Sequence, residues 1–77
     1  MNITVYSKPN CVQCEATKRL LNRENIKFTE VDLSADTNAL NLVKALGYNS
    51  APVVIADNKH WSGYRRDLLQ DLVDQSN

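Results

Sequence analysis

The first 33 residues predict a strand, a helix and a second strand in direct succession, and this order constrains the fold more than any other feature. Residues 2–7 alternate between two faces and are rich in β-branched and aromatic side chains, which favours a strand. Residues 12–23 place apolar side chains at every fourth position, which is typical of an amphipathic helix. Residues 26–33 are again strand-like. Two strands joined by a helix predict a right-handed parallel βαβ unit.

A second helix is expected to follow this unit. Either Ser34 or Asp36 can cap its start, and Gly47 stands where a left-handed residue commonly ends a helix that runs to about Leu46. The apolar side chains expected to face the core from the three predicted helices are Val12, Ala16, Leu20 and Leu21; Ala39, Leu40, Val43 and Leu46; and Leu68, Leu69, Leu72 and Val73.

The last part of the chain predicts a hairpin and a third helix. Residues 53–56 and 59–62 are strand-like, and they flank Asp57 and Asn58, a pair that suits the positive φ angles of a two-residue turn. Gly63 ends the hairpin, and a helix is expected over residues 65–74. The predicted order is therefore βαβαββα, an α/β fold.

Length and composition exclude several classes of function. With 77 residues, of which 43% are hydrophobic, the chain is expected to form one domain over residues 1–77 with a core of its own. Nine basic residues balance nine acidic ones, which argues against nucleic acid or an anionic membrane as a partner held by bulk electrostatics. The longest apolar run, residues 53–56, is far shorter than the roughly 18 residues of a transmembrane helix, and no leader-like segment opens the chain. We therefore expect a cytoplasmic protein.

The two cysteines, Cys11 and Cys14, lie three positions apart between the first predicted strand and the first predicted helix. A disulfide across so short a loop stabilises a fold by roughly 2 kcal/mol, against about 3 kcal/mol for a loop of about 15 residues, and the cytosol keeps ordinary thiols reduced. A Cys-x-x-Cys motif in a βαβ context instead indicates redox chemistry.

The position of Cys11 at the start of a helix favours its thiolate, because free amide N–H groups and the positive end of the helix dipole stabilise negative charge. Cys11 is therefore expected to attack a disulfide substrate. Cys14, one turn further on, can then attack the mixed disulfide, which releases the reduced substrate and leaves Cys11 and Cys14 oxidised. The predicted activity is dithiol–disulfide exchange.

Three other interpretations of the cysteine pair stay open. A structural zinc site needs about four ligands, and beyond the cysteines the chain offers a single histidine, His60, so that carboxylates would have to complete the site. An iron–sulfur cluster shared between two copies of the chain is a second alternative. Buried, inert cysteines are the third.

Several other candidate residues have plain structural explanations. Pro52 begins a predicted strand, and from its own properties it is expected to be trans. Plain packing also explains Trp61 and Tyr64, and His60 is expected to face solvent because it alternates with Trp61 on a short strand.

Arg65 and Arg66 open the last predicted helix. A cation there opposes the helix dipole by about 0.3–1 kcal/mol, which invites a functional interpretation. A solvated helix start, with Asp67 as partial compensation, explains the same placement equally well.

The sequence resembles the NrdH-redoxins in three segments that together span essentially the whole chain: Cys11-Val12-Gln13-Cys14, Ala51-Pro52-Val53-Val54 and Trp61-Ser62-Gly63-Tyr64-Arg65-Arg66-Asp67. The last segment of that family usually reads Trp-Ser-Gly-Phe-Arg-Pro-Asp. Here Tyr64 replaces the Phe and keeps the ring, whereas Arg66 replaces the Pro and adds a charge. The Arg66 departure bears on partner affinity more than on the chemistry.

The resemblance implies a thioredoxin fold, with a four-stranded mixed sheet flanked by three helices. It implies an electron donor to class Ib ribonucleotide reductase that is re-reduced by NADPH through thioredoxin reductase. No bound cofactor or metal is implied beyond the redox-active pair Cys11 and Cys14. A monomer is expected, because such a carrier docks with two partners in turn.

The resemblance also implies roles for individual residues. Pro52 would be cis and lie against the disulfide, exposing the backbone of Ala51 for pairing with an extended substrate. Residues 61–67 would form a hydrogen-bonded network beside the redox site. Besides catalytic Cys11 and Cys14, the residues expected to contact substrate or partners are Lys8, Val12, Gln13, Ala51, Pro52, Trp61, Ser62, Gly63, Tyr64 and Arg65.

A glutathione-dependent glutaredoxin is the alternative function within the same fold. Residues 61–67 stand where glutaredoxins carry a Gly-Gly and acidic pair that hold glutathione, and this chain lacks that motif. Lys8 can still contact the glycine carboxylate of glutathione. A metal-binding or cluster-binding module is the alternative from another class.

Overall fold

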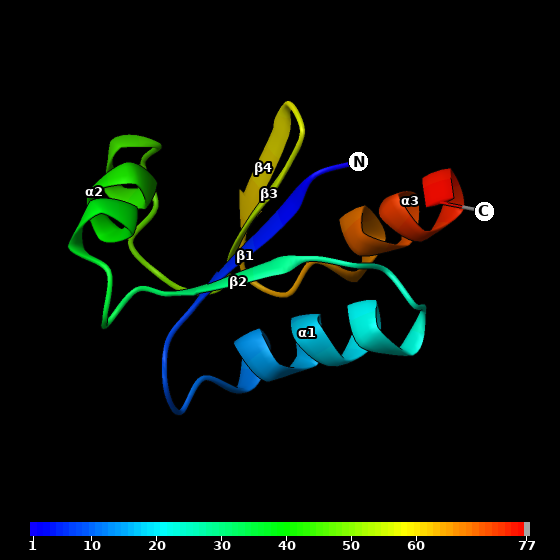
Figure 1. Cartoon of the computed structure of the whole chain (residues 1–77), viewed down its shortest axis with the longest axis horizontal. Coiled ribbons are helices and arrows are strands. Elements are labelled where there is room, and N and C mark those ends of the chain that lie inside the picture. The colour runs from blue at the N-terminus through cyan, green and yellow to red at the C-terminus, as the bar shows by residue number, and fades with distance from the viewer. Residues whose placement is uncertain (77) are drawn as a thin grey trace.

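The computed structural model describes residues 1–76, and its strands and helices follow the predicted order βαβαββα (Figure 1). Each predicted element is present, although some bounds differ. The elements are β1 (Ile3–Ser7), α1 (Val12–Arg23), β2 (Thr29–Asp32), α2 (Thr37–Ala45), β3 (Val53–Ala56), β4 (Lys59–Ser62) and α3 (Arg66–Ser76).

The four strands form one mixed sheet in the order β2-β1-β3-β4. β1 and β2 are parallel, with Val5 opposite Glu30, as expected for two strands joined by a helix. β3 runs antiparallel to β1, with Val54 opposite Val5, and β4 runs antiparallel to β3. The thioredoxin-like arrangement implied by the resemblance is therefore confirmed.

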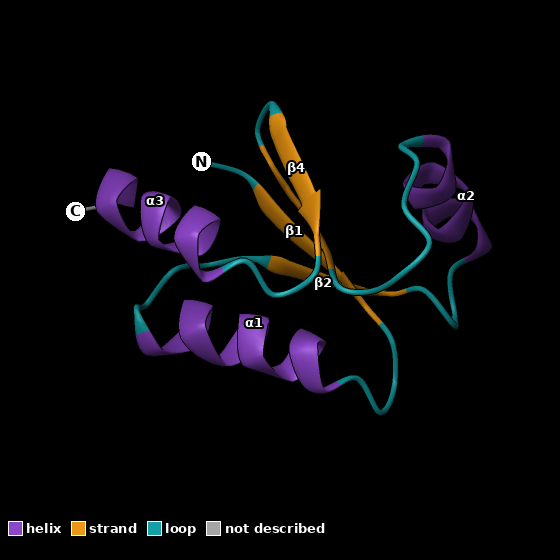
Figure 2. Cartoon of the chain, turned by 180° about the vertical axis from the view of Figure 1, so that it is seen from behind, coloured by secondary structure: helices purple, strands orange, loops and turns teal. Residues whose placement is uncertain are grey.

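Helices cover both faces of the sheet, with α1 and α3 on one side and α2 on the other (Figures 1 and 2). The alternation of β1 divides the core accordingly, because successive side chains of a strand point to opposite faces. Ile3 and Val5 belong to the cluster formed with α1 and α3, whereas Tyr6 packs with Ala39 and Val43 of α2.

The second strand is shorter than residues 26–33, the span that its pattern predicts. The chain leaves α1 through Asn25, which has a positive φ of 57°, and the Ile26 N–H donates to the Leu21 carbonyl at 2.9 Å. Ile26 therefore closes the end of the helix and is buried in the core, so regular pairing with β1 begins only at Thr29. Ile26 is apolar because it is buried, and it does not belong to a strand.

Asp36, and not Ser34, caps α2, because its Oδ1 accepts a hydrogen bond from the Ala39 N–H at 2.9 Å. Ser34 instead donates its own N–H and hydroxyl to Asp32. Gly47 has a φ of 95°, as expected of a residue that ends a helix.

The third helix spans Arg66–Ser76, one residue later at its start and two at its end than predicted. Arg65 lies just outside because its carbonyl accepts the first helical bond, from the Leu69 N–H. The three helices have 12, 9 and 11 residues, and within residues 1–76 none is long and apolar enough to cross a membrane.

The hairpin has the predicted two-residue turn, since Ala56 pairs with Lys59. Of the two turn residues only Asp57 has a positive φ, of 54°, so the same expectation for Asn58 is wrong. The turn is held from outside the hairpin, because the Asp57 N–H donates to the Asn2 carbonyl and the Asn2 N–H donates to the Asp57 carboxylate.

Val12 does not belong to the buried stripe of α1, because its side chain is 85% exposed. The buried face of this helix consists of Cys14, Thr17, Leu20 and Leu21. Val12 lies two positions before Cys14, about 200° around the helix, and therefore points to solvent. The burial of Val12 that was predicted from its four-residue spacing to Ala16 and Leu20 is therefore wrong.

Candidate active site

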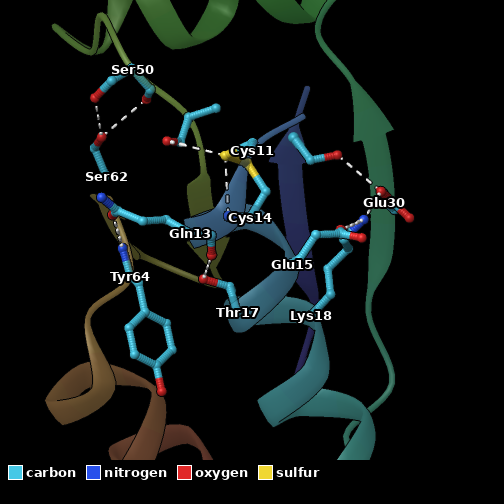
Figure 3. The surroundings of a disulfide bond; sticks show 12 residues. Cys11, Gln13, Cys14, Glu15, Thr17, Lys18, Glu30, Ser50, Ser62 and Tyr64 are labelled. Atoms are coloured by element: carbon cyan, nitrogen blue, oxygen red, sulfur yellow. Dashed lines mark hydrogen bonds and ion pairs between the residues drawn. A yellow bond between two sulfur atoms is a disulfide. The ribbon is translucent and has the colours of Figure 1, made fainter. Parts of the chain in front are cut away.

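Cys11 occupies the N-cap of α1, at the end of a loop that leaves β1 after Ser7 (Figure 3). Asn10, just before it, has a positive φ of 58°, which turns the chain into the helix. The backbone N–H of Cys14 donates to the Cys11 Sγ at 3.1 Å. An amide N–H at a helix start stabilises negative charge on the sulfur when the pair is reduced.

Cys11 and Cys14 are joined by a disulfide with their Cα atoms 5.2 Å apart. The two sulfurs differ in access, because Cys14 is completely buried whereas Cys11 is partly exposed. A substrate disulfide can therefore approach Cys11 but not Cys14. This asymmetry suits an attacking sulfur and a resolving sulfur.

The segment that begins β3 forms a second wall of the site. The Ala51 carbonyl oxygen lies 3.8 Å from the Cys11 Sγ. The Ala51–Pro52 peptide bond is cis, so the expectation from the resemblance is confirmed and the trans bond expected from proline alone is wrong. Pro52 is buried and Ala51 partly exposed.

The segment before α3 forms a third wall and is tied to the cysteine motif. Gln13, between the two cysteines, accepts through its Oε1 a hydrogen bond from the Tyr64 N–H at 2.9 Å (Figure 3). The Gly63 N–H donates to the Pro52 carbonyl at 2.7 Å. Gly63 has a φ of 89°, and a Cβ there would lie 3.3 Å from the Gln13 Oε1, so glycine suits both the backbone and the space.

Ser50 joins this network, although no pattern in the sequence indicates it. The Ser62 Oγ donates to the Ser50 carbonyl at 3.0 Å, and the two hydroxyls are 3.2 Å apart (Figure 3). The loop that carries Ala51 is thereby fastened to the end of β4.

The two arginines before and at the start of α3 differ in their surroundings. Arg65 donates from Nε and from Nη2 to the two carboxylate oxygens of Asp67, at 3.1 and 2.9 Å. These hydrogen bonds hold the pKa of Asp67 below its ordinary value. Arg66 is exposed and, within residues 1–76, has no carboxylate within 4.0 Å. Asp67 therefore compensates Arg65 rather than Arg66.

The aromatic residues nearby face in different directions. Trp61 is 5% exposed and packs in the core with α1 and α3. Its side chain is therefore covered by the protein and offers a partner little surface to contact. Tyr64 is 36% exposed. His60 faces solvent, as predicted, and its Nδ1 lies 2.6 Å from the Tyr48 hydroxyl.

A charged cluster on α1 and β2 was missed from the sequence. Glu30 accepts hydrogen bonds from Lys18 Nζ at 2.7 Å and from the Ser7 hydroxyl at 2.9 Å, and these two bonds lower its pKa. Lys18 also pairs with Glu15 at 2.6 Å, and its bonds to Glu15 and Glu30 raise its pKa. The Glu15–Lys18 spacing is visible in the sequence, whereas no local pattern links either residue to β2.

Two hollows are lined by residues of the site. One of about 740 Å³ is lined by Cys11, Val12, Lys8 and the charged cluster. A smaller one of about 240 Å³ lies between Ala51 and α2, and it is lined by Lys8 and Lys44 among others. Lys8 therefore borders both hollows.

The described residues contain no ready cluster of metal ligands. Within residues 1–76, no group of three or more His, Cys, Asp or Glu side chains lies close enough to hold a metal ion. The two cysteines are bonded to each other, and His60 contacts Tyr48.

The thioredoxin-like fold and a Cys-x-x-Cys pair at the start of α1 are typical of thiol–disulfide oxidoreductases. Comparison with known families gives the same class. The Glutaredoxin family model matches residues 3–61. The chain therefore belongs to the glutaredoxin family of thiol–disulfide oxidoreductases.

Within this family the chain is of the NrdH type. It is 39% identical over 72 residues to the glutaredoxin-like protein NrdH of Salmonella typhimurium, covering 94% of this chain and 89% of the relative. It is 36% identical over 70 residues to NrdH of Lactococcus lactis, covering 91% and 97%. The structure of NrdH-redoxin from Escherichia coli matches with a TM-score of 0.91 and 38% identity over 94% of this chain and 95% of that one. The resemblance to the NrdH-redoxins is confirmed.

Proposed function

We propose that the chain carries electrons as a dithiol from thioredoxin reductase to a class Ib ribonucleotide reductase. The Escherichia coli relative is described as having a thioredoxin-like activity profile, which supports a thioredoxin-like role for this chain. The observation that carries the proposal is the network beside the disulfide, in which Gln13 and Pro52 already accept the N–H groups of Tyr64 and Gly63.

The proposed reaction moves two electrons and two protons to the substrate. The Cys11 thiolate attacks one sulfur of the substrate disulfide, and the other substrate sulfur leaves as a thiolate and takes up a proton. The thiolate of Cys14 then attacks the Cys11 Sγ, to which it is bonded in this structure, and expels the second substrate sulfur. The substrate is reduced to two thiols while Cys11 and Cys14 are oxidised to the disulfide.

The positions of the two sulfurs support these roles. Cys11 is the accessible one and accepts the Cys14 N–H, which stabilises its thiolate both as nucleophile and as leaving group. The Ala51 carbonyl at 3.8 Å from this sulfur offers an acceptor for an N–H of the substrate chain. We propose that an extended substrate pairs there while its cystine faces Cys11.

The same network argues for thioredoxin reductase rather than glutathione as the source of electrons. A small tripeptide is recognised by the hydrogen bonds it makes to backbone and carboxylate groups. Here the N–H groups of Gly63 and Tyr64 have internal acceptors, and Asp67 is held by Arg65. Binding glutathione at this segment would have to break these bonds.

Following NADPH oxidation with a disulfide substrate tests the proposal. One reaction contains thioredoxin reductase, and a parallel reaction contains glutathione with glutathione reductase. We expect turnover with thioredoxin reductase and little above background with glutathione, and the Cys11→Ser variant should be inactive in both. A ribonucleotide reductase whose turnover depends on the chain would establish the final acceptor. Turnover with glutathione alone would contradict the proposal.

A glutathione-dependent glutaredoxin is the second candidate, and one observation favours it. The hollow of about 240 Å³ beside Ala51 is bordered by Lys8 and Lys44, two cations that suit the glycine carboxylate of glutathione. If this candidate is correct, Lys8→Gln will raise the KM for glutathione in the second reaction.

The proposed role has consequences for where and how the protein works. We expect a cytoplasmic location, because that compartment maintains reduced dithiols. We also expect a monomer, since one site must face two partners in turn. Sedimentation velocity of the reduced and oxidised forms measures the second expectation.

A further inference from the structure

We propose that two side-chain hydrogen bonds position the Ala51 carbonyl for an extended polypeptide substrate and thereby favour polypeptide disulfides over small ones. This inference rests on the proposed function and deepens it, because it names residues that set the class of substrate. The two bonds join the loop between α2 and β3 to β4, and we call them the loop–β4 bonds: Tyr48 with His60, and Ser50 with Ser62.

The first loop–β4 bond joins Tyr48 to His60. The Tyr48 hydroxyl lies 2.6 Å from the His60 Nδ1, and the two rings pack edge to face with their centroids 5.6 Å apart. The backbone of Tyr48 is held separately, because its N–H donates to the Val43 carbonyl of α2 at 3.0 Å. The Tyr48 ring also packs against the core cluster that contains Val43. Tyr48 is therefore fixed at both ends, and His60, which no step of the proposed reaction uses, holds the outer end.

The second loop–β4 bond lies two residues further along both segments. The Ser62 Oγ donates to the Ser50 carbonyl at 3.0 Å, and the two hydroxyls are 3.2 Å apart (Figure 3). His60 and Ser62 lie on the same face of β4, because alternate residues of a strand point to the same side. The loop therefore follows β4 at two successive points.

Ala51 directly follows the second of these bonds in the chain. Its carbonyl oxygen, 3.8 Å from the Cys11 Sγ, is the acceptor proposed for an N–H of the substrate. On the other side of Ala51, the Gly63 N–H donates to the Pro52 carbonyl at 2.7 Å. The loop is not packed tightly onto α2 here, since both line a hollow of about 240 Å³. The position of the Ala51 carbonyl therefore depends on hydrogen bonds to β4 and Gly63 rather than on apolar packing.

An acceptor held in place favours substrates that carry a backbone donor. An extended polypeptide can donate an N–H to the Ala51 carbonyl while its cystine faces Cys11, and a misplacement of about 1 Å is enough to slow such an aligned reaction. A small disulfide without amide groups can reach the partly exposed Cys11 without using this carbonyl. Loss of a loop–β4 bond should therefore slow the reduction of the polypeptide and leave that of the small disulfide unchanged.

Three probes with the same leaving group test this inference. Each is a mixed disulfide of thionitrobenzoate, and stopped-flow absorbance follows the release of thionitrobenzoate by the reduced protein. The other thiol is a pentapeptide with a central cysteine, the same pentapeptide N-methylated at every amide, or mercaptoethanol. Each rate constant is divided by that of the same probe with dithiothreitol, which corrects for intrinsic reactivity. With wild type we expect the unmethylated pentapeptide to react about 3–10-fold faster than the other two probes, because only it donates a backbone N–H.

Variants of the Tyr48–His60 pair assign this preference to the loop–β4 bonds. Tyr48→Phe removes the hydroxyl and keeps the ring, and it should slow the unmethylated pentapeptide about 2–5-fold while the other two probes stay within about 1.5-fold of wild type. His60→Ala should have the same effect, and the double variant should be no slower than either single one, because all three lose the same bond. His60→Asn should restore most of the rate, since its amide can accept or donate near the place of Nδ1.

Gln70→Ala is the matched control for these variants. It also removes one exposed side-chain hydrogen bond, the one that Gln70 donates to Asp74 on α3. We expect it to leave the rate constants of all three probes unchanged.

The outcomes that contradict the inference differ from those that contradict the proposed function. Equal corrected rates for the three probes, or an unchanged pentapeptide rate in Tyr48→Phe and His60→Ala, would overturn the inference while leaving dithiol exchange intact. Equal slowing of all three probes would also overturn it, because the loop–β4 bonds would then act on the fold or on the disulfide and not on substrate pairing. If wild type releases thionitrobenzoate from none of the probes, the proposed function fails and the inference with it.

Discussion

The side-chain oxygen of Gln13 accepts a hydrogen bond from the Tyr64 backbone N–H at 2.9 Å, across 51 positions of sequence. Gln13 stands between the two cysteines, so this bond joins the redox motif directly to the segment before α3. It uses a backbone donor beside the disulfide and fastens the segment that carries the exposed side chain of Tyr64.

Gln13→Ala should lower the free energy of unfolding by about 0.5–1 kcal/mol, because one hydrogen bond at a partly solvated site is lost. The exchange of the Tyr64 amide hydrogen should become faster, since its acceptor is gone. Urea denaturation and hydrogen exchange measure the two effects. Gln70→Ala on the exposed face of α3 is the matched control, and it should leave the Tyr64 amide unchanged. Equal Tyr64 exchange in wild type and Gln13→Ala would show that this bond does not hold the segment.

Alanine substitutions at Gly63 and Gly47 distinguish the cost of backbone strain from the cost of a close contact with Gln13. Gly63 and Gly47 have similar φ angles, of 89° and 95°, so alanine at either position should cost about 1–3 kcal/mol. A Cβ at Gly63 also meets the Gln13 Oε1 at 3.3 Å, whereas at Gly47 nothing lies within 4 Å. In urea denaturation, Gly63→Ala should therefore lower the free energy of unfolding by about 0.5 kcal/mol more than Gly47→Ala. Only Gly63→Ala should slow dithiol exchange. A larger loss in Gly47→Ala, or slowed exchange in both variants, would contradict this assignment.

The ion pair of Glu30 and Lys18 should make stability depend on pH. Hydrogen bonds from Lys18 and Ser7 hold the folded-state pKa of Glu30 below its ordinary value of 4.5. The contribution of Glu30 to the free energy of unfolding is therefore complete above pH 4.5 and is lost as the pH falls through the folded-state pKa. Lys18, whose pKa is raised above 10.5, contributes below that pH and loses its contribution as the pH rises through its folded-state pKa.

Glu30→Gln measures this contribution. Glu30 is 46% exposed, so solvent screening limits the expected loss to about 0.5 kcal/mol at about pH 7, with no loss at about pH 2. Urea denaturation at the two pH values gives the difference. Glu24→Gln is the control, because its carboxylate lies 4.0 Å from the Arg23 Nε and should contribute less. An equal loss at both pH values would mean that Glu30 acts through packing and not through its charge.

The order of elements and the redox pair were predictable because their signals are local. Alternation in β1, the Asp36 cap and the two-residue turn at Asp57 each depend on a few neighbouring residues. Cys11 at the start of α1 follows directly from the position of the motif between a strand and a helix.

The features that escaped prediction depend on which segments meet in space. Glu30 meets Lys18 because β2 lies beside α1, and Ser50 meets Ser62 because a loop crosses the end of β4. Val12 has the spacing of a core residue, yet the first turn of α1 buries the side that carries Cys14. Periodicity gives the faces of a helix but does not say which part of a face is covered.

Trapping of a mixed disulfide tests the central claim, that Cys11 attacks and the buried Cys14 resolves, most directly. Reduced Cys14→Ser, mixed with a peptide disulfide, should accumulate a covalent adduct at Cys11 in intact-mass spectrometry, because no second thiol expels the peptide. Wild type should instead release reduced peptide and return to the Cys11–Cys14 disulfide, and Cys11→Ser should form no comparable adduct. Full turnover by either variant, or an adduct on Cys14 of Cys11→Ser formed as fast as the one on Cys11, would contradict the account.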